Sequence, residues 1–283
     1  MTSAALALTL VAAVLHAIWN ISLKRSRDRI AFAAAMLLAC GIALMPWSIR
    51  WAASGTVPPA VWRLLAVSVA AEFAYYVCLA SGYRTGELSL VYPIARGTGA
   101  MATALAGRAL LGEHPTSAGA VGIGFVGGGL LLIGIVSARR GHAHRASVLF
   151  ALGAGACISI YSVADKTAVG QTPVVPFMGS MYLLTGIAMT IFALGRASHS
   201  AREEWRANWR MAVGAGLMSG LTYALVLVAM TMTHVGYVAA VRESSMLFAL
   251  GLAWFWLREE PDHARTAGAV LMVAGVAAIA LGG

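Results

Sequence analysis

The feature that most constrains this chain is a succession of apolar runs that are each long enough to cross a lipid bilayer. A membrane-spanning helix needs about 20 predominantly apolar residues. Ten segments meet this requirement: residues 3–23, 30–50, 61–81, 88–110, 117–137, 147–165, 173–194, 209–230, 235–257 and 264–282. The connections between them are short, and the longest covers only residues 195–208. The sequence therefore predicts an all-α integral membrane protein with ten transmembrane helices.

Composition excludes a soluble protein. Charged residues make up 11% of the chain and hydrophobic residues 60%, whereas soluble domains contain roughly 25% charged residues. A soluble protein with a net charge of +9 would suggest nucleic acid as a partner. Here the basic residues gather between the apolar runs, where they report orientation in the membrane. We therefore expect the partner to be the lipid bilayer and not nucleic acid.

The cysteines and the N-terminus carry no other signal. Cys40, Cys78 and Cys157 lie inside apolar segments and show no CxxC or Cys/His spacing, which argues against a metal site or a disulfide framework. No phosphate-cradling glycine loop is present, so no cofactor is expected. The first apolar run lacks a basic stretch before it, and we interpret it as a membrane span and not as a cleaved signal peptide.

Glycines recur at a spacing typical of helix packing in lipid. "GIGFVGGG" contains Gly124-xxx-Gly128, and "GLMSG" contains Gly216-xxx-Gly220. Small residues four positions apart allow two helix backbones to approach closely. We expect these glycines to lie at helix–helix contacts.

The chain repeats itself. "YPIARGTGAMATALAGRALLGEHP" is similar to "YVAAVRESSMLFALGLAWFWLREEP", which aligns Arg96 with Arg242 and Glu113 with Glu259, both 146 positions apart (242 minus 96 and 259 minus 113). "WNISLKR" is similar to "YSVADKT" in the same way. The predicted repeats are residues 1–140 and 147–283, with five spans each. Because five is odd, the second repeat must enter the membrane from the opposite side, as in the inverted repeats of secondary transporters.

Lysine and arginine counts predict the orientation. Fourteen of these residues lie in the connections that follow odd-numbered spans, and four lie in those that follow even-numbered spans. Cytoplasmic loops carry the excess of positive charge. The count therefore predicts that the central linker faces the cytoplasm and that both termini lie outside.

Four charged residues lie deep inside predicted spans, away from the span ends: Glu72, Arg96, Arg242 and Glu243. Such a residue at a helix centre costs about 2.5–3.5 kcal/mol on insertion scales, and it is by default a functional candidate. One interpretation is purely structural, with Glu72–Arg96 and Glu243–Arg242 as buried pairs. Adjacent residues on a helix point in different directions, however, so we expect Arg242 to face a partner other than Glu243. Arginine suits carboxylate or phosphate, and a glutamate suits an ammonium group or a proton, so the set favours a zwitterion such as an amino acid.

The other candidate substrate-binding residues surround these charges along the predicted spans: His16, Trp19, Asn20, Tyr75, Tyr76, Tyr92, Tyr161 and Tyr223. His16 and Asn20 are spaced i, i+4 and share a helix face. His16 suits proton relay and equally suits a structural hydrogen bond to a backbone carbonyl. The aromatic residues offer apolar bodies with polar tips, although any one of them is as well explained by packing.

Together these segments resemble the drug/metabolite transporter superfamily, specifically its EamA-type ten-helix members. The resemblance rests on "LHAIWNISLKRSRDR", "YPIARGTG", "LLGEHPT", "YSVADKTAVG" and "VRESSMLFALGLAWFWLREE" and covers nearly the whole chain. It implies an alternating-access transporter of small organic metabolites, commonly an exporter, with a central cavity between the two halves. It does not fix the substrate. The first half has Gly97 where the second has Glu243, so the expected cavity is not charge-symmetric.

We therefore expect an exporter of a small metabolite with an anionic group, such as an amino acid, in the bacterial inner membrane. It is either proton-linked or facilitated, and its oligomeric state is left open. The alternative within the same fold is efflux of cations or drugs, with the glutamates binding substrate. Two other classes are an intramembrane enzyme acting on lipid-linked substrates and a non-transporting sensor without a water-filled cavity.

Overall fold

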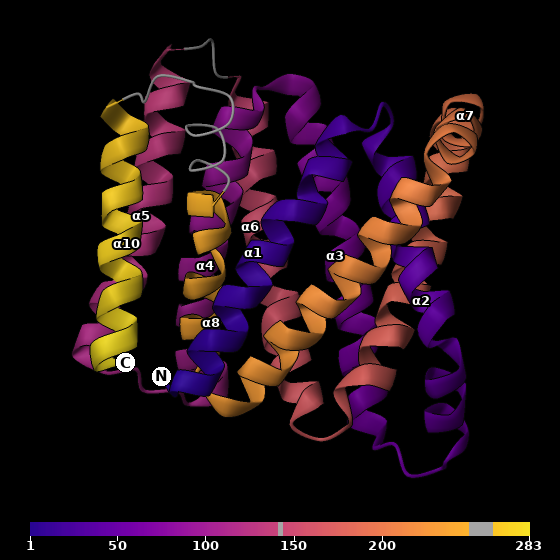
Figure 1. The fold of residues 1–283 in the computed structure, drawn as a ribbon, viewed down its shortest axis with the longest axis horizontal. Coiled ribbons are helices and arrows are strands. Elements are labelled where there is room, and N and C mark those ends of the chain that lie inside the picture. Colours follow the sequence, from indigo (N-terminus) through magenta and orange to yellow (C-terminus); the bar gives the residue numbers. More distant parts are fainter. Residues whose placement is uncertain (141–143, 249–262) are drawn as a thin grey trace.

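The computed structural model describes residues 1–140, 144–248 and 263–283, and these residues are almost entirely helical (Figure 1). The helices are α1 (Ser3–Arg25), α2 (Arg29–Ala53), α3 (Pro59–Thr85), α4 (Leu88–Leu111), α5 (Ser117–Arg140), α6 (Arg145–Val169), α7 (Val174–Met232), α8 (Val235–Arg242) and α10 (His263–Gly282). Seven of them are long and apolar enough to cross a membrane. No strand occurs in the described part of the chain, so the predicted all-α membrane fold is confirmed.

The helix α7 contains two of the predicted spans. Its 59 residues are interrupted by non-helical backbone at Ala197, and its two legs lie side by side in Figure 1. The predicted connection 195–208 continues the second leg as helix. This segment contacts the first turn of α2, where the Trp205 Nε1–H donates a hydrogen bond to the Ala31 carbonyl oxygen at 2.8 Å.

The ninth predicted span, residues 235–257, is interrupted. Helix α8 ends at Arg242, Glu243 forms a turn, and helix resumes over residues 244–248. The rest of this span lies outside the described residues, as do Glu259 and Pro261 of the repeat alignment. When the two legs of α7 are counted separately, the described residues form nine long helices, namely α1 to α6, the two legs of α7, and α10. The ten-helix count stays a prediction, because only part of the ninth predicted span is described.

The two halves run in opposite directions. A shallow depression on one end of the bundle is lined by Thr2 before α1, Glu113 after α4, Gly170 after α6, and Gly283 after α10. Both termini lie at this end in Figure 1. Since α1 begins here and α6, which holds the equivalent position in the second repeat, ends here, the architecture is a pair of inverted repeats.

Equivalent helices of the two halves pack against each other, α2 on α7 and α5 on α10. Between α5 and α10 the approach is close: a Cβ on Gly122 would lie 2.6 Å from the Gly275 carbonyl oxygen, and one on Gly129 2.6 Å from the Gly268 carbonyl oxygen. Only glycine fits at such a contact.

The glycine predictions are confirmed at one place and wrong at the other. A Cβ on Gly216 or Gly220 would collide with Met36 or Cys40 of α2, as expected for a packing motif. Gly124 and Gly128 have nothing within 4 Å of a Cβ. The face of α5 that meets α10 instead carries Gly122 and Gly129, which lie seven positions apart and not four.

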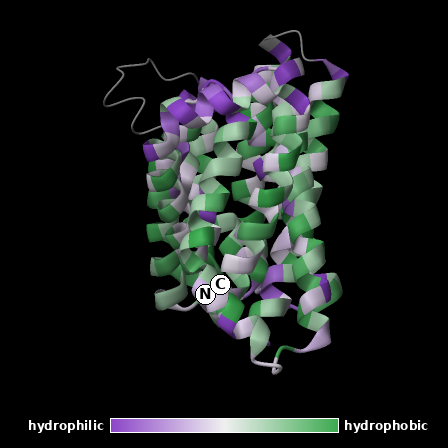
Figure 2. Cartoon of the chain, turned by 90° about the vertical axis from the view of Figure 1, so that its right-hand side faces the viewer, coloured by the Kyte–Doolittle hydropathy of each residue, from purple (hydrophilic) through white to green (hydrophobic). Residues whose placement is uncertain are grey.

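The outer surface is apolar. Large side chains such as Leu105, Leu110 and Ile191 are 68–73% exposed, and hydrophobic residues cover the sides of the bundle in Figure 2. Hydrophilic residues gather most densely at the end opposite the termini (Figure 2). A surface of this kind faces lipid along its sides and water at its ends.

Candidate functional site

A cavity of about 90 Å³ lies between the two halves. Helices α1, α3 and α4 line it from the first half, and α6, α7 and α8 line it from the second. It contains every predicted site residue except Glu243: His16, Trp19, Asn20, Glu72, Tyr75, Tyr76, Tyr92, Arg96, Tyr161, Tyr223 and Arg242. The structure thus brings residues from six helices to one place, with a volume that suffices for a few water molecules.

Arg96 joins the two halves through an ion pair. Its Nε–H donates to Glu243 Oε2 at 2.7 Å, and the two side chains are 3% and 2% exposed. Its guanidinium carbon lies 5.8 Å from the centre of the Tyr92 ring. The structural interpretation that paired Glu72 with Arg96 and Glu243 with Arg242 is wrong, because Glu243 reaches across to the arginine of the other repeat.

Arg242 has no such partner. It is 4% exposed and forms no ion pair with any residue in the described ranges. Its Nε and Nη2 atoms are buried without a hydrogen-bond acceptor, and so are Arg96 Nη2 and Trp19 Nε1. Buried donors without acceptors are costly in a folded protein. Four of them around one cavity define a place for an acceptor that the described protein does not supply.

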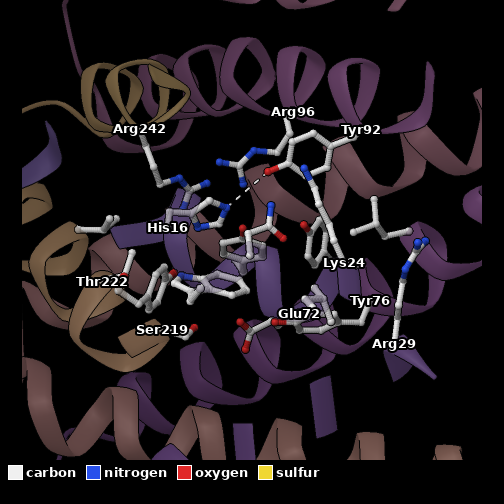
Figure 3. A pocket seen from close by; sticks show the side chains of 18 of the residues that line it. His16, Lys24, Arg29, Glu72, Tyr76, Tyr92, Arg96, Ser219, Thr222 and Arg242 are labelled. Carbon is white, nitrogen blue, oxygen red and sulfur yellow. Dashed lines mark hydrogen bonds between the residues drawn. The ribbon is translucent and has the colours of Figure 1, made fainter. Parts of the chain in front are cut away.

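The opposite wall of the cavity is acidic. In Figure 3, Arg96 and Arg242 lie on one side, with His16 beneath them, and Glu72 lies on the other. Glu72 Oε2 accepts a hydrogen bond from the Thr185 hydroxyl at 3.2 Å. No basic side chain among the described residues pairs with this carboxyl group. The cavity therefore has a cationic wall and an anionic wall.

Aromatic side chains fill the space between the two walls. The His16 Nε2 and Tyr92 hydroxyl are 3.4 Å apart, and the His16 ring meets Trp19 edge-on with centroids 4.6 Å apart. Tyr161 lies edge-on to Tyr75 and to Tyr223, at 6.2 and 6.5 Å. The alternative for His16, a hydrogen bond to a backbone carbonyl, is not seen in the described part of the chain. These rings separate the charged walls and present polar atoms toward the cavity.

Several residues near the cavity were missed by the sequence analysis. Tyr182, Ser219 and Thr222 line it from α7. Asp165 of α6 is fully buried and accepts a hydrogen bond from the Tyr223 hydroxyl. Asp165 stands in the quoted "YSVADKT" segment, at the last residue of the predicted span 147–165, and the alignment of this segment with "WNISLKR" was the one signal that pointed to it.

The cavity extends toward the end of the bundle opposite the termini. Lys24 and Arg29 line it there. Lys24 belongs to the last turn of α1. In the described part of the chain its side chain forms no hydrogen bond or ion pair. The site is therefore continuous with a basic mouth.

Comparison with known proteins gives a family and a fold. The family model of the EamA-like transporter family matches residues 3–135 and again 145–281. No curated protein matches the chain significantly. A solved crystal structure of a protein with 17% sequence identity is similar over 99% of both chains, with a TM-score of 0.76. At that identity the likeness concerns the fold alone.

Proposed function

We propose, starting from the fact that this chain belongs to the EamA-like transporter family, that it transports a small zwitterion such as an amino acid. Membership makes the chain a multi-pass membrane transporter with a small-molecule substrate and a lipid environment. The family gives no support to an enzyme acting on lipid-linked substrates. The substrate class, the direction and the mechanism are our proposals.

The observation that carries the proposal is the Arg242 guanidinium, which has two buried nitrogens without an acceptor and faces Glu72 across the cavity. A guanidinium group binds a carboxylate through two parallel hydrogen bonds, which are stronger than neutral ones because both partners are charged. Glu72 on the opposite wall supplies the complementary charge for an ammonium group. A zwitterion satisfies both walls at once without adding net charge to a buried site.

The size of the cavity favours a small substrate. Pockets for drug-sized ligands measure about 300–1,000 Å³, whereas this one measures about 90 Å³. Efflux of bulky cations would require the lining aromatic residues to rearrange. Binding of a small amino acid requires a much smaller rearrangement of these aromatic side chains.

The mouth of the cavity supports export. Lys24 and Arg29 lie at the basic end, which the distribution of positive charge assigns to the cytoplasm. At the opposite end, Glu113 accepts a hydrogen bond from the backbone N–H of Val235 at 2.9 Å and pairs with Lys166 at 2.9 Å. These contacts tie the end of α4 to the end of α6 and to the start of α8. The cavity is thus placed to receive substrate from the cytoplasm of a bacterial cell, with both termini outside.

Inverted repeats supply a route to the other side. Each half can adopt the arrangement now held by its partner, which would close the Lys24 end and open the Lys166 end. We keep residues 1–140 and 147–283 as the two units of this exchange. Arg96, Arg242, Glu72 and Glu243 would remain near the centre throughout.

Uptake into proteoliposomes tests the proposal. Purified protein is reconstituted, and the uptake of radiolabelled amino acids is compared with the uptake of lipophilic cations. We expect amino acids to move and Arg242→Gln to weaken the apparent affinity of the protein for them. Arg108→Gln is a matched control, since Arg108 is exposed in the last turn of α4 away from the cavity.

The same assay decides the second candidate function, cation efflux. Glu72 lacks a cationic partner in the described residues, which is the one feature that favours it. If only lipophilic cations move, and Glu72→Gln but not Arg242→Gln stops them, the zwitterion proposal is wrong. If neither class moves, transport of these substrates is excluded and the non-transporting alternative gains support.

A further inference from the structure

A second acidic residue lies beside the cavity, and the substrate proposal does not use it. Asp165 of α6 is 0% exposed. Its Oδ2 accepts a hydrogen bond from the Tyr223 hydroxyl, while its Oδ1 is buried with no hydrogen-bond partner. The Ser162 hydroxyl, three residues earlier on the same helix face, is likewise buried and unpartnered. An orphan carboxylate oxygen in an apolar interior requires an explanation.

Asp165 and Glu72 are both buried beside the cavity, and each carboxyl group influences the other electrostatically. Around Glu72 stand Tyr76 on its own helix, Tyr161 on α6, and Tyr182 and Thr185 on α7. Around Asp165 stand Ser68 on α3, Tyr223 on α7, and Arg242 on α8, which acts at a distance without a hydrogen bond. Hydroxyl groups therefore surround the pair. No basic side chain in the described ranges forms an ion pair with either carboxyl group.

The buried charges around the cavity indicate how many protons belong there. Arg96 and Glu243 neutralise each other at 2.7 Å. Arg242 is balanced by a single carboxylate, and with both Glu72 and Asp165 ionised one negative charge is left over. An uncompensated charge in a medium of low dielectric constant is strongly unfavourable. One proton shared between the two carboxyl groups makes the buried set neutral.

We propose that Asp165 and Glu72 together form a proton-binding site, in which the Tyr223 hydroxyl hydrogen-bonds Asp165 and a bound proton removes the excess buried negative charge. Glu243 is not this site, because its side chain already forms an ion pair with Arg96 at 2.7 Å. The inference deepens the proposed transport function by naming the residues that carry its coupling proton. Since Glu72 also faces the substrate cavity, a substrate ammonium group and the proton compete for the same negative charge.

Infrared spectroscopy of the full-length protein in lipid tests this site without a substrate. A protonated carboxyl group gives a C=O stretching band that is distinct from that of a carboxylate and shifts in D2O. We expect the wild type to show such a band at neutral pH and to lose it as the pH rises. Asp165→Asn and Glu72→Gln should each remove the titrating band, and Tyr223→Phe should shift its frequency because a donor is lost.

Asp28→Asn is the matched control. Asp28 is also buried, but it pairs with Arg196 at 2.8 Å and caps α2, a role that asparagine can keep. This variant should leave the titrating band unchanged. If Asp165→Asn fails to fold, the Glu72 and Tyr223 variants and the wild-type titration still decide the matter.

Absence of a protonated-carboxyl band in the wild type at every pH would overturn the site, and so would a band of full intensity in both the Asp165 and Glu72 variants. Either result leaves the substrate proposal standing if Arg242-dependent amino acid uptake persists. If the wild type shows the titrating band but no amino acid uptake, only the substrate proposal is overturned. The two failures are therefore distinguishable.

Discussion

Arg96 and Arg242 occupy equivalent positions in the two repeats, yet their surroundings differ. Arg96 is paired with Glu243 at 2.7 Å, whereas Arg242 has two buried donor atoms without an acceptor. The difference begins with the next residue in each repeat, Gly97 against Glu243. A Cβ on Gly97 would lie 3.0 Å from the Gly127 carbonyl oxygen of α5, so a glutamate there would crowd α5. Only one glutamate follows the two equivalent arginines. It pairs with Arg96, and Arg242, which lacks this partner, faces the cavity.

Under the proposed function, this asymmetry distinguishes an arginine that stabilises the fold, Arg96, from one that binds substrate, Arg242. The paired guanidinium holds the halves together near the centre of the bundle. The unpaired guanidinium is available to a ligand carboxylate. Replacing either residue should therefore damage a different property of the protein.

The largest effect is expected on stability, from Arg96→Gln. Removing one partner of a buried ion pair leaves the other charge uncompensated, which destabilises proteins by about 3–5 kcal/mol. Thermal unfolding of the purified protein in detergent would measure the loss as a lower Tm. The double variant Arg96→Gln with Glu243→Gln removes both charges and should recover most of it. A double variant as unstable as the single one would show that the ion pair is not what Arg96 contributes.

A smaller effect, on binding, is expected from Arg242→Gln. A hydrogen bond to a charged group contributes about 1.5–3 kcal/mol, which corresponds to a roughly 10- to 150-fold weaker apparent affinity. Concentration-dependent uptake in proteoliposomes would measure it. Arg242→Lys keeps the charge but not the planar fork, and should fall in between. The Tm should change less than in Arg96→Gln; a reversed order would contradict the distinction between the two arginines.

The smallest effects concern the two ends of the bundle, where the repeat-related lysines also differ. Lys166 pairs with Glu113 and donates to the Met230 carbonyl oxygen at 3.0 Å. Its side chain is 21% exposed, so we discount the pair to about 1 kcal/mol or less. Lys24 has no partner in the described residues, and Lys24→Gln should change stability by no more than about 0.5 kcal/mol. Chemical unfolding of both variants, with Lys24→Gln as the control for Lys166→Gln, would compare them. Equal losses of stability in the two variants would contradict the distinction between the closed end at Lys166 and the open end at Lys24.

The fold could be predicted from hydropathy because lipid requires every spanning segment to satisfy its own backbone. The interruption of the helix after Arg242 could not be predicted in this way. The apolar pattern continues through it, and the Glu243 side chain meets an arginine on a helix 147 positions away along the chain. The face on which α5 meets α10 was also missed, because glycine spacing does not say how a helix is rotated about its axis.

The candidate site was predicted in outline because the repeat places equivalent residues at equivalent depths. The partner of each charge was not predictable. Glu72, Glu243 and Asp165 are all acids inside apolar runs, and only the packing of α3, α4 and α6 decides which one meets a base. Asp165 also falls at the last residue of the predicted span 147–165, where an acid is usually interpreted as part of the interface.

The central claim, a water-filled cavity that presents Arg242 to an anion, is tested most directly by thiol accessibility. In a background without Cys40, Cys78 and Cys157, Thr222→Cys places a thiol at the cavity wall. Thr103→Cys is a matched control. Both threonines are buried, and each donates only to a carbonyl of its own helix at 2.7 Å, but Thr103 does not line the cavity.

The account predicts that the thiol at position 222 reacts with water-soluble methanethiosulfonates, faster with an anionic reagent than with a cationic one, and that the preference disappears when Arg242→Gln is added. The thiol at position 103 should stay unreactive. Equal, slow reaction at both positions, or a faster reaction with the cationic reagent, would contradict it.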